Sequence, residues 1–188
     1  MRVYVVRHGE SETNYNKKWT GWIDAALTDK GKDDAKRAGN LLKTITFDKV
    51  FTSDLCRAIE TATIAIPECR YETSALLREI NVGTLAGTPL NSITEKERAH
   101  IDQNGYADYD GEKKAEFYER IRLFIRELEA LECENIAVFS HNGWIRGMLD
   151  IVIGHYMPRN RVCCNNCTIA IFEYTNETWK LHSWINTI

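Results

Sequence analysis

Residues 2–9 of the chain read Arg2-Val3-Tyr4-Val5-Val6-Arg7-His8-Gly9, in which four successive apolar residues precede Arg7 and His8. Such a short, valine-rich run is typical of a β-strand that is buried on both faces. Similar apolar runs follow at residues 49–52 and 135–140, and segments with helical periodicity separate them. Strands that alternate with helices predict an α/β fold, a three-layer sandwich with a mostly parallel central sheet and helices on both faces.

Capping residues and apolar spacing place the helices between these strands. Thr28 is a candidate N-cap for one helix and Ser53 for a second, which Pro67 ends. Two more helices are predicted from about Glu112 and over 142–153, the latter ending at a glycine. The chain closes with two predicted strands, at 167–174 and 178–184.

Length and composition restrict the class of protein. The 188 residues suit a single domain over 1–188, and the irregular, polar stretch at about 91–111 reads as an insertion on the substrate side. Lys and Arg number 24 against 27 Asp and Glu, a net charge of −3, so the sequence does not favour nucleic-acid binding. No apolar run approaches the ~20 residues that span a bilayer, and no signal peptide is apparent. We expect a cytoplasmic protein with no membrane partner.

Three of the six cysteines form a cluster, Cys163, Cys164 and Cys167. A metal site is one interpretation, but structural zinc usually needs four ligands in paired spacings, and no second pair or histidine partner lies nearby. Buried reduced thiols in or beside a strand are the favoured interpretation.

Basic and imidazole side chains follow three of the predicted strands. Arg7 and His8 end the first strand, Arg57 lies in the first turn of the helix after the second, and His141 follows the strand at 135–140. Ligands of open α/β sheets bind at the carboxyl ends of the strands, so these groups should converge, together with two helix N-termini. The arrangement predicts a site for a compact dianion such as phosphate, which the arginine fork suits.

His8 is the candidate nucleophile, because the sequence has no P-loop, no Rossmann turn and no cysteine phosphatase loop. A neutral imidazole can attack phosphorus, while Arg7, Arg57 and His141 neutralise charge without a metal or other cofactor. Glu79 also follows a predicted strand, precedes a glycine-bearing loop and could protonate the leaving oxygen. Taken singly, each of these residues is more simply a structural histidine, an ion-paired arginine or a surface carboxylate, so the prediction depends on their joint placement.

Several blocks of the sequence together resemble one known family. They are Arg7-His8-Gly9-Glu10-Ser11-Glu12-Thr13-Asn14, Gly21-Trp22-Ile23-Asp24, Thr52-Ser53-Asp54-Leu55-Cys56-Arg57, Leu77-Arg78-Glu79-Ile80, Ser140-His141-Asn142-Gly143 and Asn166-Cys167-Thr168-Ile169. In this order they resemble the histidine phosphatase superfamily, the phosphoglycerate mutase-like proteins. The resemblance implies a phosphoglycerate mutase-like α/β fold. It also implies that His8 is the phosphorylated nucleophile, that Glu79 is the proton donor, and that Arg7, Asn14, Arg57 and His141 form the phosphate pocket. Asn142 departs from the family, where many members carry glycine.

Three functions remain open within this resemblance. The first is a phosphomonoester hydrolase for a small phosphorylated metabolite, and the second is a phosphoglycerate mutase. Mutases of this kind carry a Glu-Arg-His-Tyr-Gly run and an arginine pair, whereas here Glu79 precedes Ile80-Asn81-Val82-Gly83 and no Arg-Arg occurs. The third is a non-catalytic phosphate-binding module, although nothing of the motif is lost. Substrate selection is open as well. One set of aromatic residues either lines a pocket rim or, as the simpler interpretation, packs in the core or on the surface: Trp19, Trp22, Tyr106, Tyr109 and Trp144. One set of basic residues in or beside the insertion either recognises a second anionic group or forms a charged helix face: Lys96, Arg98, Lys113 and Lys114.

Overall fold

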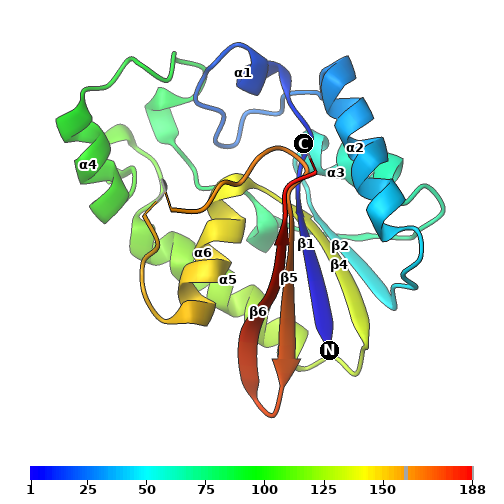
Figure 1. Cartoon of the computed structure of the whole chain (residues 1–188). Helices are drawn as coiled ribbons and strands as arrows, with labels where there is room; N and C mark the ends of the chain where they lie inside the picture. Colours follow the sequence, from blue (N-terminus) through cyan, green and yellow to red (C-terminus); the bar gives the residue numbers. More distant parts are fainter. Residues whose placement is uncertain (159–160, 188) are drawn as a thin grey trace.

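The computed structural model describes residues 1–158 and 161–187, and within them six strands form one mixed sheet in the order β3-β2-β4-β1-β5-β6 (Figure 1). The strands are β1 (Arg2–Arg7), β2 (Lys49–Ser53), β3 (Glu72–Ser74), β4 (Asn135–Ser140), β5 (Ile169–Thr175) and β6 (Thr178–Ile185). The neighbours from β3 to β1 are parallel, whereas β5 and β6 run antiparallel at one edge. The predicted α/β fold is confirmed, with the sheet mixed rather than purely parallel.

Helices cover both faces of this sheet (Figure 1). They are α1 (Glu12–Tyr15), α2 (Asp29–Leu42), α3 (Cys56–Ala65), α4 (Glu95–Asn104), α5 (Lys114–Glu129) and α6 (Asn142–Ile153), with short 3-10 turns η1 (Ala75–Leu77), η2 (Gly83–Leu85) and η3 (Ala107–Tyr109). The strand β1 is apolar on both faces: Val3 and Val5 pack with α5 and α6, whereas Tyr4 and Val6 pack with α2. Burial of both faces explains the unbroken apolar run in the sequence.

The helix ends show where the capping prediction holds and where it fails. Thr28 caps α2, its Oγ1 accepting a hydrogen bond of 3.0 Å from the Gly31 amide. Ser53 does not cap α3, because it still pairs with β3 as the last residue of β2. The chain bends after β2, and Leu55, whose backbone is extended, is the N-cap residue, so α3 starts at Cys56. The helix N-terminus therefore lies two residues beyond the predicted place.

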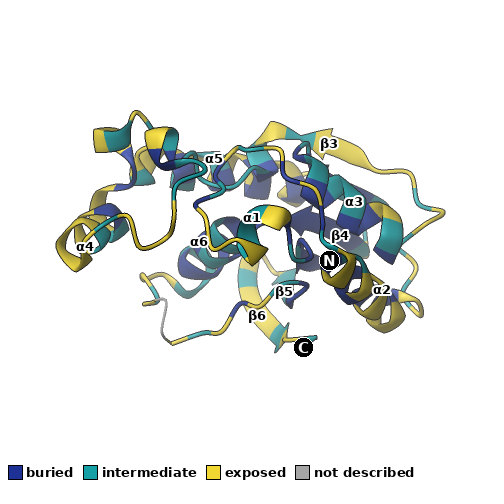
Figure 2. Cartoon of the chain, turned by 90° about the horizontal axis from the view of Figure 1, so that it is seen from above, coloured by how far each residue is buried: buried dark blue, intermediate teal, exposed yellow. Residues whose placement is uncertain are grey.

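The segment that leads to the candidate acid Glu79 is not the strand that we predicted. The strand β3 ends at Ser74, and the 3-10 turn η1 follows, with Leu77 fully buried. Beyond it, the stretch at 91–111 contains α4, whose outer surface is largely exposed (Figure 2), and η3. The division into one domain with an insertion there stays a prediction.

The cysteine cluster is buried only in part. All three cysteines lie in the irregular segment before β5, where Cys164 and Cys167 are buried, as expected, but Cys163 is exposed. In the described residues all six cysteines are free thiols. The same residues contain no helix that is long and apolar enough to cross a membrane.

Candidate active site

The carboxyl ends of β1 and β4 bring the predicted basic residues together. The parallel register sets Arg7 opposite Ser140, so His8 and His141 emerge side by side, with ring centroids 5.1 Å apart. Arg57 enters from the first turn of α3, which follows the neighbouring strand β2. The predicted convergence at one edge of the sheet is therefore present.

The imidazole of His8 is held as one tautomer. Its Nδ1 lies 2.7 Å from the Gly9 carbonyl oxygen, which can only accept, so Nδ1 carries the proton. The Nε–H of Arg57 points at Nε2 from 3.3 Å, which also requires a lone pair on that nitrogen. Burial, followed by the charges of Arg57 and Arg7, lowers the pKa of His8 well below its usual 6.5. His8 is thus a neutral base with Nε2 unprotonated at pH 7.

Arg57 is fully buried and tethered by backbone carbonyls. Its two terminal nitrogens donate to Ile23 and Gly21, at 2.8 and 2.9 Å. Burial lowers the pKa of Arg57 to about 10, so the guanidinium keeps its charge at neutral pH. Thr61, one turn further along α3, donates to the Arg57 carbonyl and accepts from the Gly9 amide, which ties the arginine to the histidine loop.

Arg7 and His141 carry buried polar atoms that lack acceptors or donors. One terminal nitrogen of Arg7 donates to the Cys164 carbonyl, but its Nε has no hydrogen-bond partner among the described residues. Neither ring nitrogen of the fully buried His141 has one in that part of the chain either. Burial, then the charge of Arg57, lowers the pKa of His141 well below 6.5. Unpaired buried groups are costly, and here they belong to residues at the carboxyl ends of β1 and β4, next to His8 in the fold.

The carboxylate of Glu79 lies at the N-terminus of α6. Its Oε2 accepts a hydrogen bond of 3.0 Å from the amide of Gly143, the second residue of that helix, and its Oε1 accepts from the Ile80 amide at 2.9 Å. The N-cap residue of α6, His141, makes no capping bond with its side chain, and the Glu79 carboxylate accepts from a helix amide in its place. The sequence analysis assigned no role to Gly143. In the structure, a Cβ at this position would lie only 2.2 Å from Oε1 of Glu79, so the close approach of the carboxylate depends on glycine.

Asn14 joins the site through a residue that sequence analysis did not assign. Asn166, before β5, donates from Nδ2 to Oδ1 of Asn14 at 3.2 Å and to the His8 carbonyl at 3.1 Å. The only sequence signal was its place in the Asn166-Cys167-Thr168-Ile169 block. Asn142, where glycine is common in the family, begins α6 with a helical backbone and accepts from Nε of Arg146 at 2.9 Å. The departure from glycine therefore leaves the helix start intact.

A cavity of about 490 Å³ opens at this edge of the sheet. Five of the predicted site residues line it, namely Arg7, His8, Asn14, Arg57 and Glu79. The sixth, His141, is fully buried next to His8 and is not among the lining residues. From the two sets left open above, the wall includes only Trp19, Tyr106, Arg98 and Lys114. Trp144 is instead part of the hydrophobic core under α5. The described residues contain no group of three or more His, Cys, Asp or Glu side chains arranged to hold a metal ion.

A buried, neutral histidine beside two arginines and a carboxylate is suited to phosphoryl transfer, and comparison with known proteins agrees. A model of the histidine phosphatase superfamily (branch 1) matches residues 3–187, so the chain belongs to that family. The expectation of a histidine phosphatase is thereby confirmed.

Individual relatives carry both phosphatase and mutase names. The chain is 29% identical to a protein named as a probable phosphoglycerate mutase, GpmB, of Salmonella arizonae, over 98% of this chain and 90% of the relative. A phosphoglycerate mutase structure from Bacillus anthracis str. Sterne is 25% identical with a TM-score of 0.85, covering 97% of this chain and 92% of the other. A structure of a protein described as an α-ribazole-5'-P phosphatase from Escherichia coli K-12 is 24% identical, with a TM-score of 0.85 and coverages of 100% and 97%. The last similarity concerns the fold alone.

Proposed function

We propose that the protein hydrolyses a small phosphomonoester through a covalent phosphohistidine on His8. The observation that carries this proposal is the fixed tautomer of His8, with Nδ1 bound by the Gly9 carbonyl and Nε2 facing the Arg57 N–H. An imidazole that is neutral and already oriented needs no further deprotonation before it attacks. We also propose a cytoplasmic location, in keeping with the free thiols of the described cysteines.

In the first chemical step, Nε2 of His8 forms a bond to phosphorus while the bond from phosphorus to the ester oxygen breaks. The departing oxygen takes a proton from the carboxyl group of Glu79, so that an alcohol leaves rather than an alkoxide. Arg7, Arg57, Asn14 and His141 would hold the three other phosphoryl oxygens, which supplies the charge neutralisation that phosphoryl transfer requires.

In the second step, water attacks phosphorus and the bond to Nε2 breaks. The Glu79 carboxylate takes the proton of the water, which restores the enzyme and releases inorganic phosphate. The cationic groups of the site come from protein side chains, and we therefore propose turnover without a metal ion. If a second phosphorylated acceptor replaced water, the same chemistry would make a mutase, the activity that the Salmonella relative is named for.

Leaving-group dependence tests the role of Glu79. Glu79→Gln should lower kcat/KM for an alkyl phosphate about 10²–10⁴-fold, because the alkoxide then leaves without a proton. A nitrophenyl phosphate should lose far less, since its leaving group is stable as an anion. The value of kcat/KM is the right quantity because it reports steps up to phosphoenzyme formation and not the later hydrolysis.

The controls separate this effect from general damage. Arg57→Ala should slow both esters, because the transferred group carries the same charge whichever alcohol leaves. Glu129→Gln, at the far end of α5, should change neither. Equal slowing of the two esters by Glu79→Gln would exclude the acid role, and transfer of phosphate to an added phosphoglycerate in place of water would favour the mutase.

A further inference from the structure

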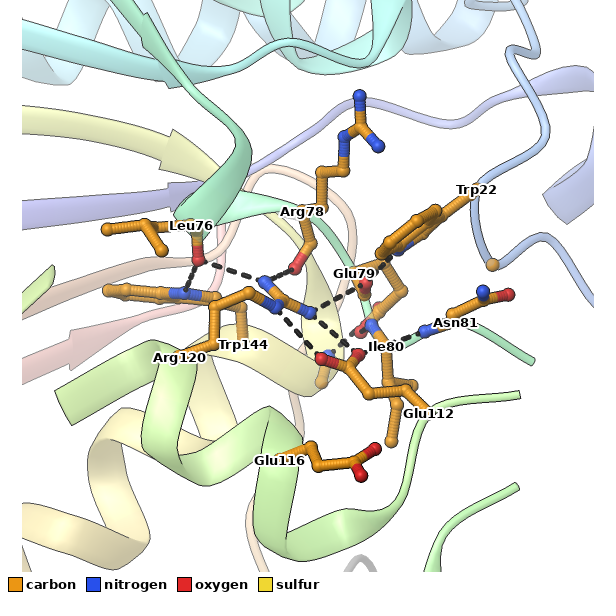
Figure 3. A network of polar contacts seen from close by, with 12 residues as sticks. Trp22, Leu76, Arg78, Glu79, Ile80, Asn81, Glu112, Glu116, Arg120 and Trp144 are labelled. Atoms are coloured by element: carbon orange, nitrogen blue, oxygen red, sulfur yellow. Dashed lines mark hydrogen bonds and ion pairs between the residues drawn. The ribbon is translucent and has the colours of Figure 1, made fainter. Parts of the chain in front are cut away.

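The backbone around Glu79 is held by side chains from four other parts of the chain (Figure 3). The carbonyl of Leu76 accepts from Nε1 of Trp144 at 2.9 Å, and that of Leu77 from the Ser140 hydroxyl at 2.7 Å. The carbonyl of Glu79 itself accepts from Nε1 of Trp22 at 2.7 Å. Since β3 ends at Ser74, these carbonyls have no strand partner, and side chains satisfy them instead.

Arg120, on α5, makes more of these bonds than any other side chain drawn in Figure 3. One terminal nitrogen donates to the carbonyls of Leu76 and Arg78, at 2.9 and 2.8 Å, and the other reaches the carbonyl of Glu79 at 3.2 Å. Nε donates to Oε1 of Glu112 at 2.9 Å, and the second terminal nitrogen donates to Oε2 of Glu112 at 2.8 Å. Every N–H of the guanidinium thus has an acceptor among the described residues.

Glu112 extends the same arrangement to the far side of Glu79. Its Oε2 accepts from the Asn81 amide at 3.2 Å, and its own amide donates to the Asn81 carbonyl at 2.8 Å. The side chains of Arg120 and Glu112 are each only 13% exposed, so water competes little for these bonds. Together the pair fixes the chain immediately before and after the carboxylate.

We propose that the Arg120–Glu112 pair is the positioning device for the catalytic acid, acting through the backbone at 76–81 on the carboxyl of Glu79. This rests on the proposed role of Glu79. The carboxyl must meet both the Gly143 amide and the leaving oxygen, and a displacement of about 1 Å in such a group can cost about 10²-fold in rate. Lysine keeps the charge at position 120 but cannot make the same planar set of bonds.

Arg120→Lys tests the positioning role. We expect kcat/KM for an alkyl phosphate to fall about 10- to 100-fold, with nitrophenyl phosphate changed only a few-fold, because only the first ester needs a proton delivered in place. Arg126→Lys is the matched control, since Arg126 lies on the same helix in an exposed pair with Glu119 and should change neither rate. Glu112→Gln is the second variant, and it should show the same selective loss with the alkyl phosphate. Thermal unfolding of each variant is measured to check that the protein is folded.

A double variant distinguishes positioning from a merely structural role. In the Glu79→Gln background, Arg120→Lys should cause no further loss with the alkyl phosphate, because the group it positions is already gone. Equal slowing of both esters by Arg120→Lys and Glu112→Gln, or losses that multiply with that of Glu79→Gln, would overturn the positioning role. A failure of the proposed function would give a different result. If Glu79 were not the acid, Glu79→Gln alone would slow the alkyl and the nitrophenyl phosphate equally.

Discussion

Gly143→Ala should damage the delivery of the proton while leaving the fold intact. The new Cβ would lie 2.2 Å from Oε1 and 3.1 Å from Cδ of Glu79, so the carboxyl has to move by roughly 1 Å to reach ordinary contact distance. Movement of that size breaks the 3.0 Å bond from the Gly143 amide and takes the acid out of line. We expect kcat/KM for an alkyl phosphate to fall on the order of 10²-fold.

The free energy of unfolding of the Gly143→Ala protein should rise slightly or stay unchanged, while its activity falls. Position 143 lies in the first turn of α6, where alanine is favoured over glycine by about 1 kcal/mol or less. The assay compares kcat/KM for an alkyl and a nitrophenyl phosphate alongside thermal unfolding. Gly39→Ala is the contrasting control, because its Cβ would meet the Ala65 carbonyl oxygen at 2.6 Å, which should lower the unfolding temperature without changing the ratio of the two rates. A Gly143→Ala protein with both rates unchanged would refute the placement of Glu79.

Three further outcomes follow from the charges of the site. Arg57→Ala should reduce kcat/KM about 10²–10³-fold for good and poor leaving groups alike, and selective loss with one ester would contradict this. Activity should persist in EDTA, and its loss followed by restoration with one divalent ion would show that a metal is needed. His8 and His141 have pKa values well below 6.5 in the folded protein, whereas the unfolded chain protonates them near 6.5. Their effect on stability is therefore nil above about pH 6.5, and the fold is progressively destabilised as the pH falls below it, because only the unfolded chain takes up the protons. Urea unfolding from pH 7.5 to 5 should show that decline, and His141→Gln should flatten it.

Local sequence patterns were sufficient for the features that depend on neighbours along the chain. The unbroken apolar run of β1 and the apolar spacing of α5 are set by which of their faces are buried, so strands, helices and the convergence of Arg7, His8 and His141 could be predicted. The β4 boundaries, at Asn135 and Ser140, agree with the prediction for the same reason.

Contacts between distant segments could not be read in this way. Ser53 has the chemistry of an N-cap, but pairing with β3 keeps it in the sheet, and that pairing is a tertiary effect. Arg120 and Asn166 contact backbone that is at least 41 and 158 residues away in sequence, so no local pattern marks them. The exposed Cys163 belongs to the irregular segment before β5, where periodicity carries no information about burial.

The most direct test of the phosphohistidine mechanism is rapid-quench trapping with a ³²P-labelled phosphomonoester. The wild-type protein should yield a phosphoryl adduct that is labile in acid and stable in base, as a phosphoramidate is, and peptide mapping should place it on His8. His8→Ala should give neither the adduct nor turnover, whereas Glu79→Gln should still form the adduct from a nitrophenyl ester. Full turnover by His8→Ala, or a label on any other residue, would contradict the assignment of His8 as the nucleophile.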